Sequence, residues 1–72
     1  MRDLNQVQGP KQKVEWIEDA LKLVRERYPT ATKEGSLGSY SFWVGKDLVG
    51  EAWIRSKWGW WLRIAETPVK GT

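Results

Sequence analysis

The sequence contains no cysteine and no histidine. Disulfide bonds are therefore impossible, and zinc sites built on cysteine or histidine, cysteine nucleophiles and histidine general bases are excluded. A phosphate-binding loop is missing as well, because segment 35–38 lacks the lysine of such a loop and does not open a helix. Glu51 is the one carboxylate placed among aromatic and arginine residues, and we assign it to an ion pair with Arg63 or with a residue of a neighbouring strand. We therefore expect a protein that is not an enzyme and that binds no metal or cofactor.

Long hydrophobic runs are also missing. No stretch of the 72 residues is long or apolar enough to cross a bilayer, and no signal-peptide pattern opens the chain. By default we expect a cytoplasmic protein without a membrane partner. A chain of this length makes one domain, and without disulfides it needs a dense core or an oligomer to be stable.

Tryptophan, in contrast, is abundant and concentrated in one stretch. Residues 39–66 hold five of the six tryptophans. Alternation of apolar and polar residues between glycine-containing turns predicts two hairpins here, and hence a three-stranded antiparallel sheet. In the second hairpin, Lys57-Trp58-Gly59 fits a three-residue loop with glycine in the left-handed region.

That loop predicts the register of the second hairpin. One face would pair Ser56 with Trp60, Ile54 with Leu62 and Ala52 with Ile64. The other face would pair Arg55 with Trp61, Trp53 with Arg63 and Glu51 with Ala65. The first face is almost purely apolar, whereas the second alternates tryptophan with arginine, a combination that forms cation–π contacts.

The first strand has two alternative orientations. We place Tyr40, Phe42 and Val44 on the apolar face, because the opposite choice would put Ser39 and Ser41 into the core. This orientation requires a three-residue turn, Gly45-Lys46-Asp47, with Asp47 in the left-handed region. A two-residue turn would flip the strand and expose Tyr40 and Phe42. In the preferred orientation Trp43 lies beside Trp53 and Trp61.

A helix is predicted from Pro10 to Tyr28, because proline suits a first helical turn and Pro29 enforces the stop. Its buried stripe consists of Val14, Ile17, Leu21, Val24 and Tyr28. The outer arc carries four acids and two bases, a sum of −2, so the net charge of +3 leaves +5 on the rest of the chain. The sheet side is therefore expected to be basic.

The remaining segments are predicted from their polarity and their prolines. Residues 1–9 are expected to form a flexible arm and residues 67–72 a flexible tail, with Pro68 ending the last strand. Residues 30–33 have enough strand propensity to add a short edge. The sequence thus predicts a single α+β domain over residues 10–66, in which one N-terminal helix packs on a three-stranded antiparallel β-meander.

One helix covers only one face of such a sheet. The small residues Gly50 and Ala52 favour a close approach of the helix to the middle strand, over the Ile54, Leu62 and Ile64 face. The helix then leaves the tryptophan face without a cover. Three tryptophans on one face would expose more apolar surface than monomers usually leave bare, which indicates a binding surface or an interface.

Nucleic acid is the ligand that we hypothesise, single strands before duplexes. Aromatic rings on a sheet, flanked by arginine and lysine, are typical of surfaces on which unpaired bases stack. The site residues predicted on this basis are Trp43, Trp53, Arg55, Lys57, Trp58, Trp61 and Arg63. Lys33 and Lys46 would extend the basic rim of this site.

Two alternatives use the same face. The first is a protein-binding inhibitor or adaptor, of the small kind that phages and mobile elements encode, with Trp58 as an anchor on the hairpin tip. The second is self-association, in which two sheets pack face to face as a homodimer or the N-terminal arm folds over the tryptophans.

Overall fold

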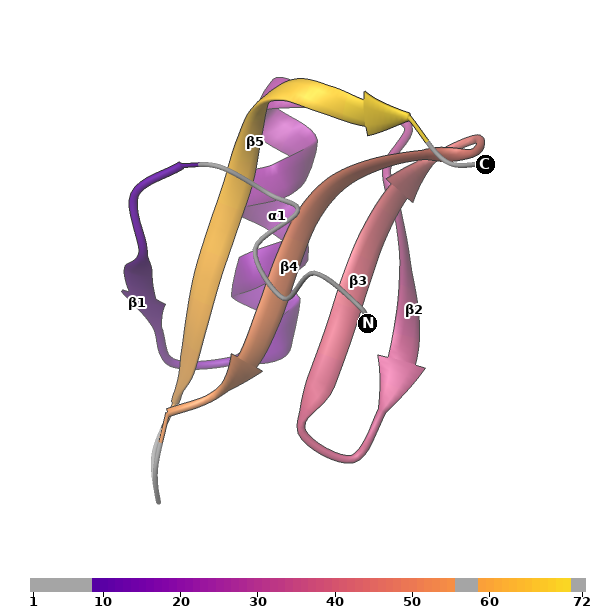
Figure 1. Ribbon diagram of the computed structural model, residues 1–72. Coiled ribbons are helices and arrows are strands. Elements are labelled where there is room, and N and C mark those ends of the chain that lie inside the picture. The colour runs from indigo at the N-terminus through magenta and orange to yellow at the C-terminus, as the bar shows by residue number, and fades with distance from the viewer. Residues whose placement is uncertain (1–8, 56–58, 71–72) are drawn as a thin grey trace, which may run out of the picture.

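The computed structural model describes residues 9–55 and 59–70 of the chain. Its elements are β1 (Gln12–Val14), α1 (Ile17–Arg27), β2 (Thr32–Ser36), β3 (Ser39–Val44), β4 (Asp47–Ile54) and β5 (Trp60–Lys70). The strands form one antiparallel sheet in the order β1-β5-β4-β3-β2, and α1 lies against one of its faces (Figure 1). The α+β class is confirmed, but the three-stranded meander is wrong because an edge strand flanks it on each side.

The helix starts later than the sequence predicts. It begins at Ile17, and the preceding Trp16 has the extended dihedral angles φ −126° and ψ 149°. The residues assigned to its first turns instead form β1, which pairs with β5 from Trp60 to Leu62. The predicted start at Pro10 is therefore wrong, whereas the predicted stop near Tyr28 is confirmed. No helix in the described ranges is long and apolar enough to cross a membrane.

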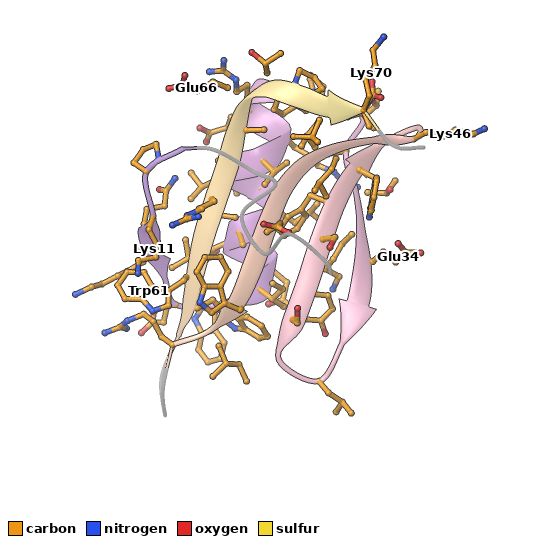
Figure 2. All side chains as sticks on the ribbon, viewed as in Figure 1. Lys11, Glu34, Lys46, Trp61, Glu66 and Lys70 are labelled. Atoms are coloured by element: carbon orange, nitrogen blue, oxygen red, sulfur yellow. The ribbon has the colours of Figure 1, made fainter. Side chains whose placement is uncertain are left out.

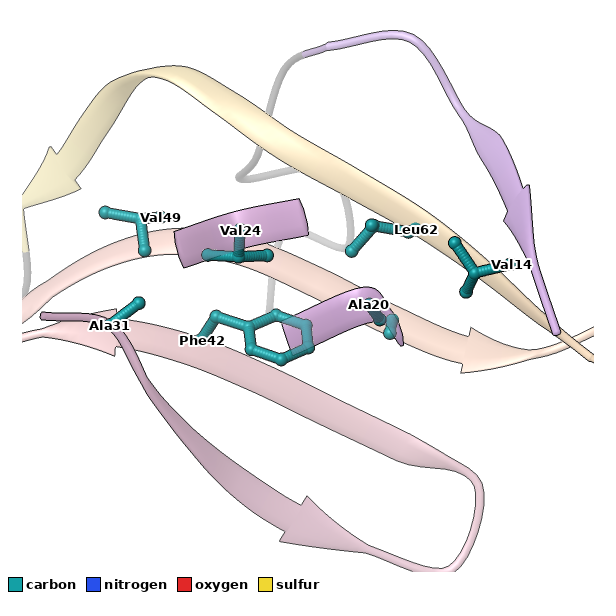
Figure 3. Packing of buried hydrophobic residues seen from close by; sticks show 8 residues of the cluster. Val14, Ala20, Val24, Ala31, Phe42, Val49 and Leu62 are labelled. Carbon is teal, nitrogen blue, oxygen red and sulfur yellow. The ribbon is translucent and has the colours of Figure 1, made fainter. Parts of the chain in front are cut away.

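The core lies between α1 and the middle of the sheet (Figure 3). Its buried residues are Val14, Ala20, Val24, Ala31, Phe42, Val49, Ala52 and Leu62. Gly50 lets the helix approach, because a Cβ added there would lie 3.4 Å from Val24 Cγ2 and 3.2 Å from Phe42 Cδ2. The predicted close packing of the helix over β4 is thus confirmed.

The hairpin between β3 and β4 combines a shorter turn with a bulge. Val44 pairs with Asp47, so the turn has two residues, and its left-handed residue is Gly45 with φ +61°. The predicted three-residue turn with Asp47 in the left-handed region is therefore wrong. The register shifts between the Trp43–Leu48 and Phe42–Gly50 pairs, so Val49 is the extra residue of a β-bulge. The two-residue turn alone would have turned Phe42 to the outer side of the sheet, and the bulge turns it back toward the helix. Phe42 is consequently buried, as predicted.

The hairpin between β4 and β5 has the predicted faces in a different register. Ile54 pairs with Trp60, Trp53 with Trp61 and Ala52 with Leu62. Each partner lies two residues from the predicted one, so the predicted pairs are wrong, while the even shift keeps every side chain on its face. Ile54, predicted in the core, is 50% exposed at the end of the sheet. Gly59 has a positive φ, as predicted, and residues 56–58, including Lys57 and Trp58, lie outside the described residues.

The last strand bends sharply and continues past the predicted stop. Its register with β4 jumps between the Gly50–Ile64 and Leu48–Val69 pairs, and β5 curves across the end of the sheet (Figure 1). The end of the helix holds this bend, because Tyr28 Oη donates to the Ala65 carbonyl and Arg27 Nη2 donates to the Glu66 carbonyl at 2.7 Å.

Pro68 therefore lies within β5, and the prediction that it ends the strand is wrong. Residues 67–70, predicted as part of a tail, belong to β5, while residues 71–72 and the predicted arm up to residue 8 lie outside the described residues. The short edge predicted after the helix is confirmed as β2, which spans Thr32–Ser36.

Candidate functional site

The sheet face opposite α1, called the outer face below, carries one row of side chains that crosses four strands. Lys13 of β1 pairs with Trp61 of β5, Trp61 pairs with Trp53 of β4, and Trp53 pairs with Ser39 of β3. Neighbouring strands are about 4.8 Å apart, so directly opposed side chains are in reach of one another. Trp53 and Trp61 are both half-buried, and together they form an indole pair in the middle of this row.

Three cationic groups surround the Trp61 ring. Measured to the ring centroid, Lys11 Nζ lies at 4.6 Å, Lys13 Nζ at 5.9 Å and Arg55 Cζ at 5.3 Å. Figure 2 shows Lys11 and Trp61 side by side at the β1 edge. Each cation is within the range in which the ring quadrupole attracts it, and the same groups concentrate positive charge at one indole.

The second indole carries its own cation. Arg63 Cζ lies 5.7 Å from the centroid of the Trp53 ring. We call the whole group the basic aromatic cluster, and its members are Lys11, Lys13, Trp53, Arg55, Trp61 and Arg63. Of the predicted site residues, the structure brings together Trp53, Arg55, Trp61 and Arg63.

Sequence reasoning missed Lys11 and Lys13, because it assigned their segment to a helix. In the extended segment that leads into β1 they are two residues apart and share a face, whereas on a helix they would not. The signal was present in the sequence, where Lys11-Gln12-Lys13-Val14 alternates and only Val14 is buried. The apolar residues that predict the helix can be counted from Ile17, where α1 begins. Residues 11–14 are not needed for that pattern.

Trp43 does not join the other two tryptophans. The residue of β3 that pairs with Trp53 is Ser39, and Trp43 lies four residues further along the strand. Trp43 packs instead against a small buried cluster formed by Leu48 and Ala65, as does the partly buried Val69. Its indole Nε1 is buried and has no hydrogen-bond partner within residues 9–55 and 59–70. The expected placement beside Trp53 and Trp61 is therefore wrong, because the bend of β5 encloses this end of the outer face.

The acidic residues of the outer face lie toward β2. Glu51 of β4 stands directly opposite Arg63 of β5, which favours the structural ion-pair role expected for Glu51. One strand further, Ser41 pairs with Glu51, and Glu34 of the edge strand pairs with Ser41. Positive charge thus gathers over β1 and β5, and negative charge gathers over β4 and β2.

The expected extension of the basic rim does not form. Lys33 pairs with the core residue Phe42, and Lys33 Nζ lies 4.8 Å from the Tyr40 ring centroid on the helix side. Lys46 lies in the turn at the far end of the molecule from Lys11 (Figure 2). Lys13 of β1 and Lys11 just before it take the place that we expected Lys33 and Lys46 to fill.

Comparisons with protein-family models, with curated proteins and with solved structures find no match for this chain. The chemistry of the site is therefore argued from its own geometry. In the part of the chain that the structure describes, no three Asp or Glu residues gather as a set of metal ligands. A pair of indoles with four neighbouring cations suits a ligand that is planar and anionic at once.

Proposed function

We propose that this protein is a non-catalytic module that binds single-stranded nucleic acid through the basic aromatic cluster. The observation that carries the proposal is the convergence of Lys11, Lys13 and Arg55 on the ring of Trp61. An unpaired base offers a planar face to stack on an indole, worth about 1–3 kcal/mol per base. Its flanking phosphates offer the anions that the cations attract.

Single strands are favoured over duplexes because of where the indoles lie. Trp53 and Trp61 are on a sheet face, and stacking on them requires the flat side of a base. In a duplex that side is occupied by neighbouring base pairs, and only base edges are accessible in the grooves. The modest net charge of +3 also argues against a large electrostatic footprint on a duplex.

Titration of the intrinsic tryptophan fluorescence with an oligonucleotide at low salt tests the proposal. Stacking on Trp53 or Trp61 should quench or shift the emission, and the effect should weaken steeply as salt is added. An emission spectrum that stays unchanged at saturating oligonucleotide would refute nucleic acid as the ligand. Trp61→Ala should weaken binding by about 5- to 150-fold, the equivalent of one stacked base.

The matched control is Trp16→Ala. Trp16 is 60% exposed and is the N-cap residue of α1, the helix that lies against the face opposite the cluster. The same chemical change there should leave the oligonucleotide affinity at the wild-type value. Equal losses in the two variants would mean that exposed tryptophan in general, and not the cluster, causes the binding.

Protein recognition is the second candidate, as an inhibitor or adaptor. It is favoured by the exposure of large apolar side chains, since Leu37 is 99% exposed and Ile54 is 50% exposed. These two residues lie near each other, because Ile54 N donates to the carbonyl of Gly38 in the turn after Leu37. Capture of one specific protein that survives high salt, without any response to oligonucleotides, would favour this candidate.

A homodimer through the outer face is the remaining alternative. It would bury Trp53 and Trp61 between two copies, and it would have to pair the charges of Arg55 and Arg63. Sedimentation over a range of concentrations distinguishes it, because a chain that stays monomeric at high micromolar concentration does not dimerise through this face. The proposed location is the cytoplasm, where single-stranded RNA is available as a ligand.

A further inference from the structure

The basic aromatic cluster ends abruptly on one side. Along the row that crosses the outer face, the two indoles are followed by Ser39 of β3, which offers no ring for stacking. In the adjacent row, Arg63 is followed by Glu51, Ser41 and then Glu34 at the β2 edge. A phosphate that moved from β5 toward β2 would therefore leave the lysines, pass Arg63 and Glu51, whose opposite charges balance, and meet the Glu34 carboxylate.

The opposite side of the cluster carries positive charge. Lys13 lies on β1, the edge strand beyond β5, Lys11 directly precedes this strand, and their ammonium groups lie 5.9 Å and 4.6 Å, respectively, from the Trp61 ring centroid. Figure 2 shows the separation directly, with Lys11 and Trp61 at the β1 edge and Glu34 beside β2. Attraction at one end and repulsion at the other define a direction and a length for the ligand.

We infer that the site takes two successive nucleotides of a strand that enters over β1 and leaves the surface after Trp53. One base stacks on Trp61 and the next on Trp53, while Lys11 and Lys13 hold the phosphates at the entry. Beyond Trp53 the row continues with Ser39, which cannot stack with a base, and Glu34 at the β2 edge repels the following phosphates. This inference rests on the proposed function. It specifies a binding site for two nucleotides, whereas a fully basic sheet face would bind a longer stretch of the strand.

The first experiment measures affinity against 5′-phosphorylated oligothymidylates of two to eight nucleotides, so that even the dimer carries two phosphates. From the dimer to the octamer the affinity should rise only about sevenfold, since an octamer offers seven overlapping dinucleotide steps to a two-base site. The salt dependence should be shallow and the same for all lengths, because about two phosphates contribute about 0.7 each to the slope of log K against log salt concentration.

Single substitutions test where the nucleic-acid strand enters the site. Lys11→Gln and Lys13→Gln should each lower the salt slope by about 0.7, because each removes one phosphate contact. Lys46→Gln and Lys70→Gln remove the same charge at the far end of the molecule and should leave the slope unchanged (Figure 2). Equal effects of all four substitutions would overturn the inference, because they would reflect net charge alone.

A substitution that should strengthen binding tests where the strand leaves the surface. Glu34 is exposed on the edge strand β2, so Glu34→Lys should fold normally. It should strengthen binding of the octamer and raise its salt slope, with no effect on the dimer. Should wild-type affinity instead climb steeply with every added nucleotide, the short site is wrong while nucleic-acid binding stands. A wild-type protein that binds none of these oligonucleotides at low salt would overturn both.

Discussion

Trp61 and Leu62 are adjacent in β5, and the pair tests which face of the sheet is core. Leu62 is fully buried between α1 and the sheet, whereas Trp61 is half-buried on the outer face. Leu62→Ala should therefore cost about 2–5 kcal/mol of stability, the usual loss for a buried leucine that leaves a cavity. A domain of this size is stable by roughly 4–10 kcal/mol, so the variant should lose a large part of its stability.

The expected loss for Trp61→Ala is smaller. The substitution removes three cation–π contacts, with Lys11, Lys13 and Arg55, each worth about 0.5–1 kcal/mol at an exposed site. Without the ring the three cations can move apart, and the weaker repulsion between them offsets part of this loss. We expect a net loss of about 1–2 kcal/mol in stability, together with the loss of oligonucleotide affinity described above.

Urea denaturation followed by circular dichroism measures both variants on one scale. The midpoint should fall much further for Leu62→Ala than for Trp61→Ala, with similar slopes. Oligonucleotide affinity, measured well below the unfolding transition, should show the opposite order. Equal stability losses would mean that Trp61 is part of the core, and the assignment of the outer face as a binding surface would then fail.

Two further predictions concern the packing of the helix. Gly50→Ala should destabilise the protein by about 1–3 kcal/mol, because the added Cβ would lie 3.1 Å from the Arg63 carbonyl oxygen and 3.2 Å from Phe42 Cδ2. An unchanged thermal midpoint would contradict this close approach. Tyr28→Phe should cost about 1 kcal/mol in urea denaturation, because the Ala65 carbonyl loses its donor. Oligonucleotide affinity should be unaffected by Tyr28→Phe, and a fall would contradict the separation of this hydrogen bond from the cluster.

Much of the sheet follows from alternation alone. The pattern of β3, β4 and β5 places Phe42, Ala52 and Leu62 under the helix and Trp53 and Trp61 on the outer face, and all five are found there. Alternation predicts the face of a side chain well because the face depends only on parity. It predicts the partner poorly, and the register of the second hairpin differs by two residues without any change of face.

The β1 strand could not be predicted in the same way. Its three residues gain their structure from pairing with β5, a contact between segments nearly fifty residues apart. Val14 fits the helical stripe and the strand equally well, because both place it in the core. The spacing of apolar residues favoured a helix over this segment. For that reason the predicted site did not include Lys11 and Lys13. The bend of β5 has a similar origin, since the donors that hold it come from Arg27 and Tyr28 of the helix end.

The hairpin of β3 and β4 has a consequence for chain length. Its two-residue turn and its bulge each reverse the inside and outside of a strand, and together they cancel. One residue inserted at Gly45-Lys46 would lengthen the turn to three residues and leave the Val44–Asp47 pair and the bulge beyond it in place. The same residues would then stay inward with a longer connection. Such a hairpin has a built-in way to absorb single insertions, so descendants of this chain can vary the loop while keeping the hydrophobic interior intact.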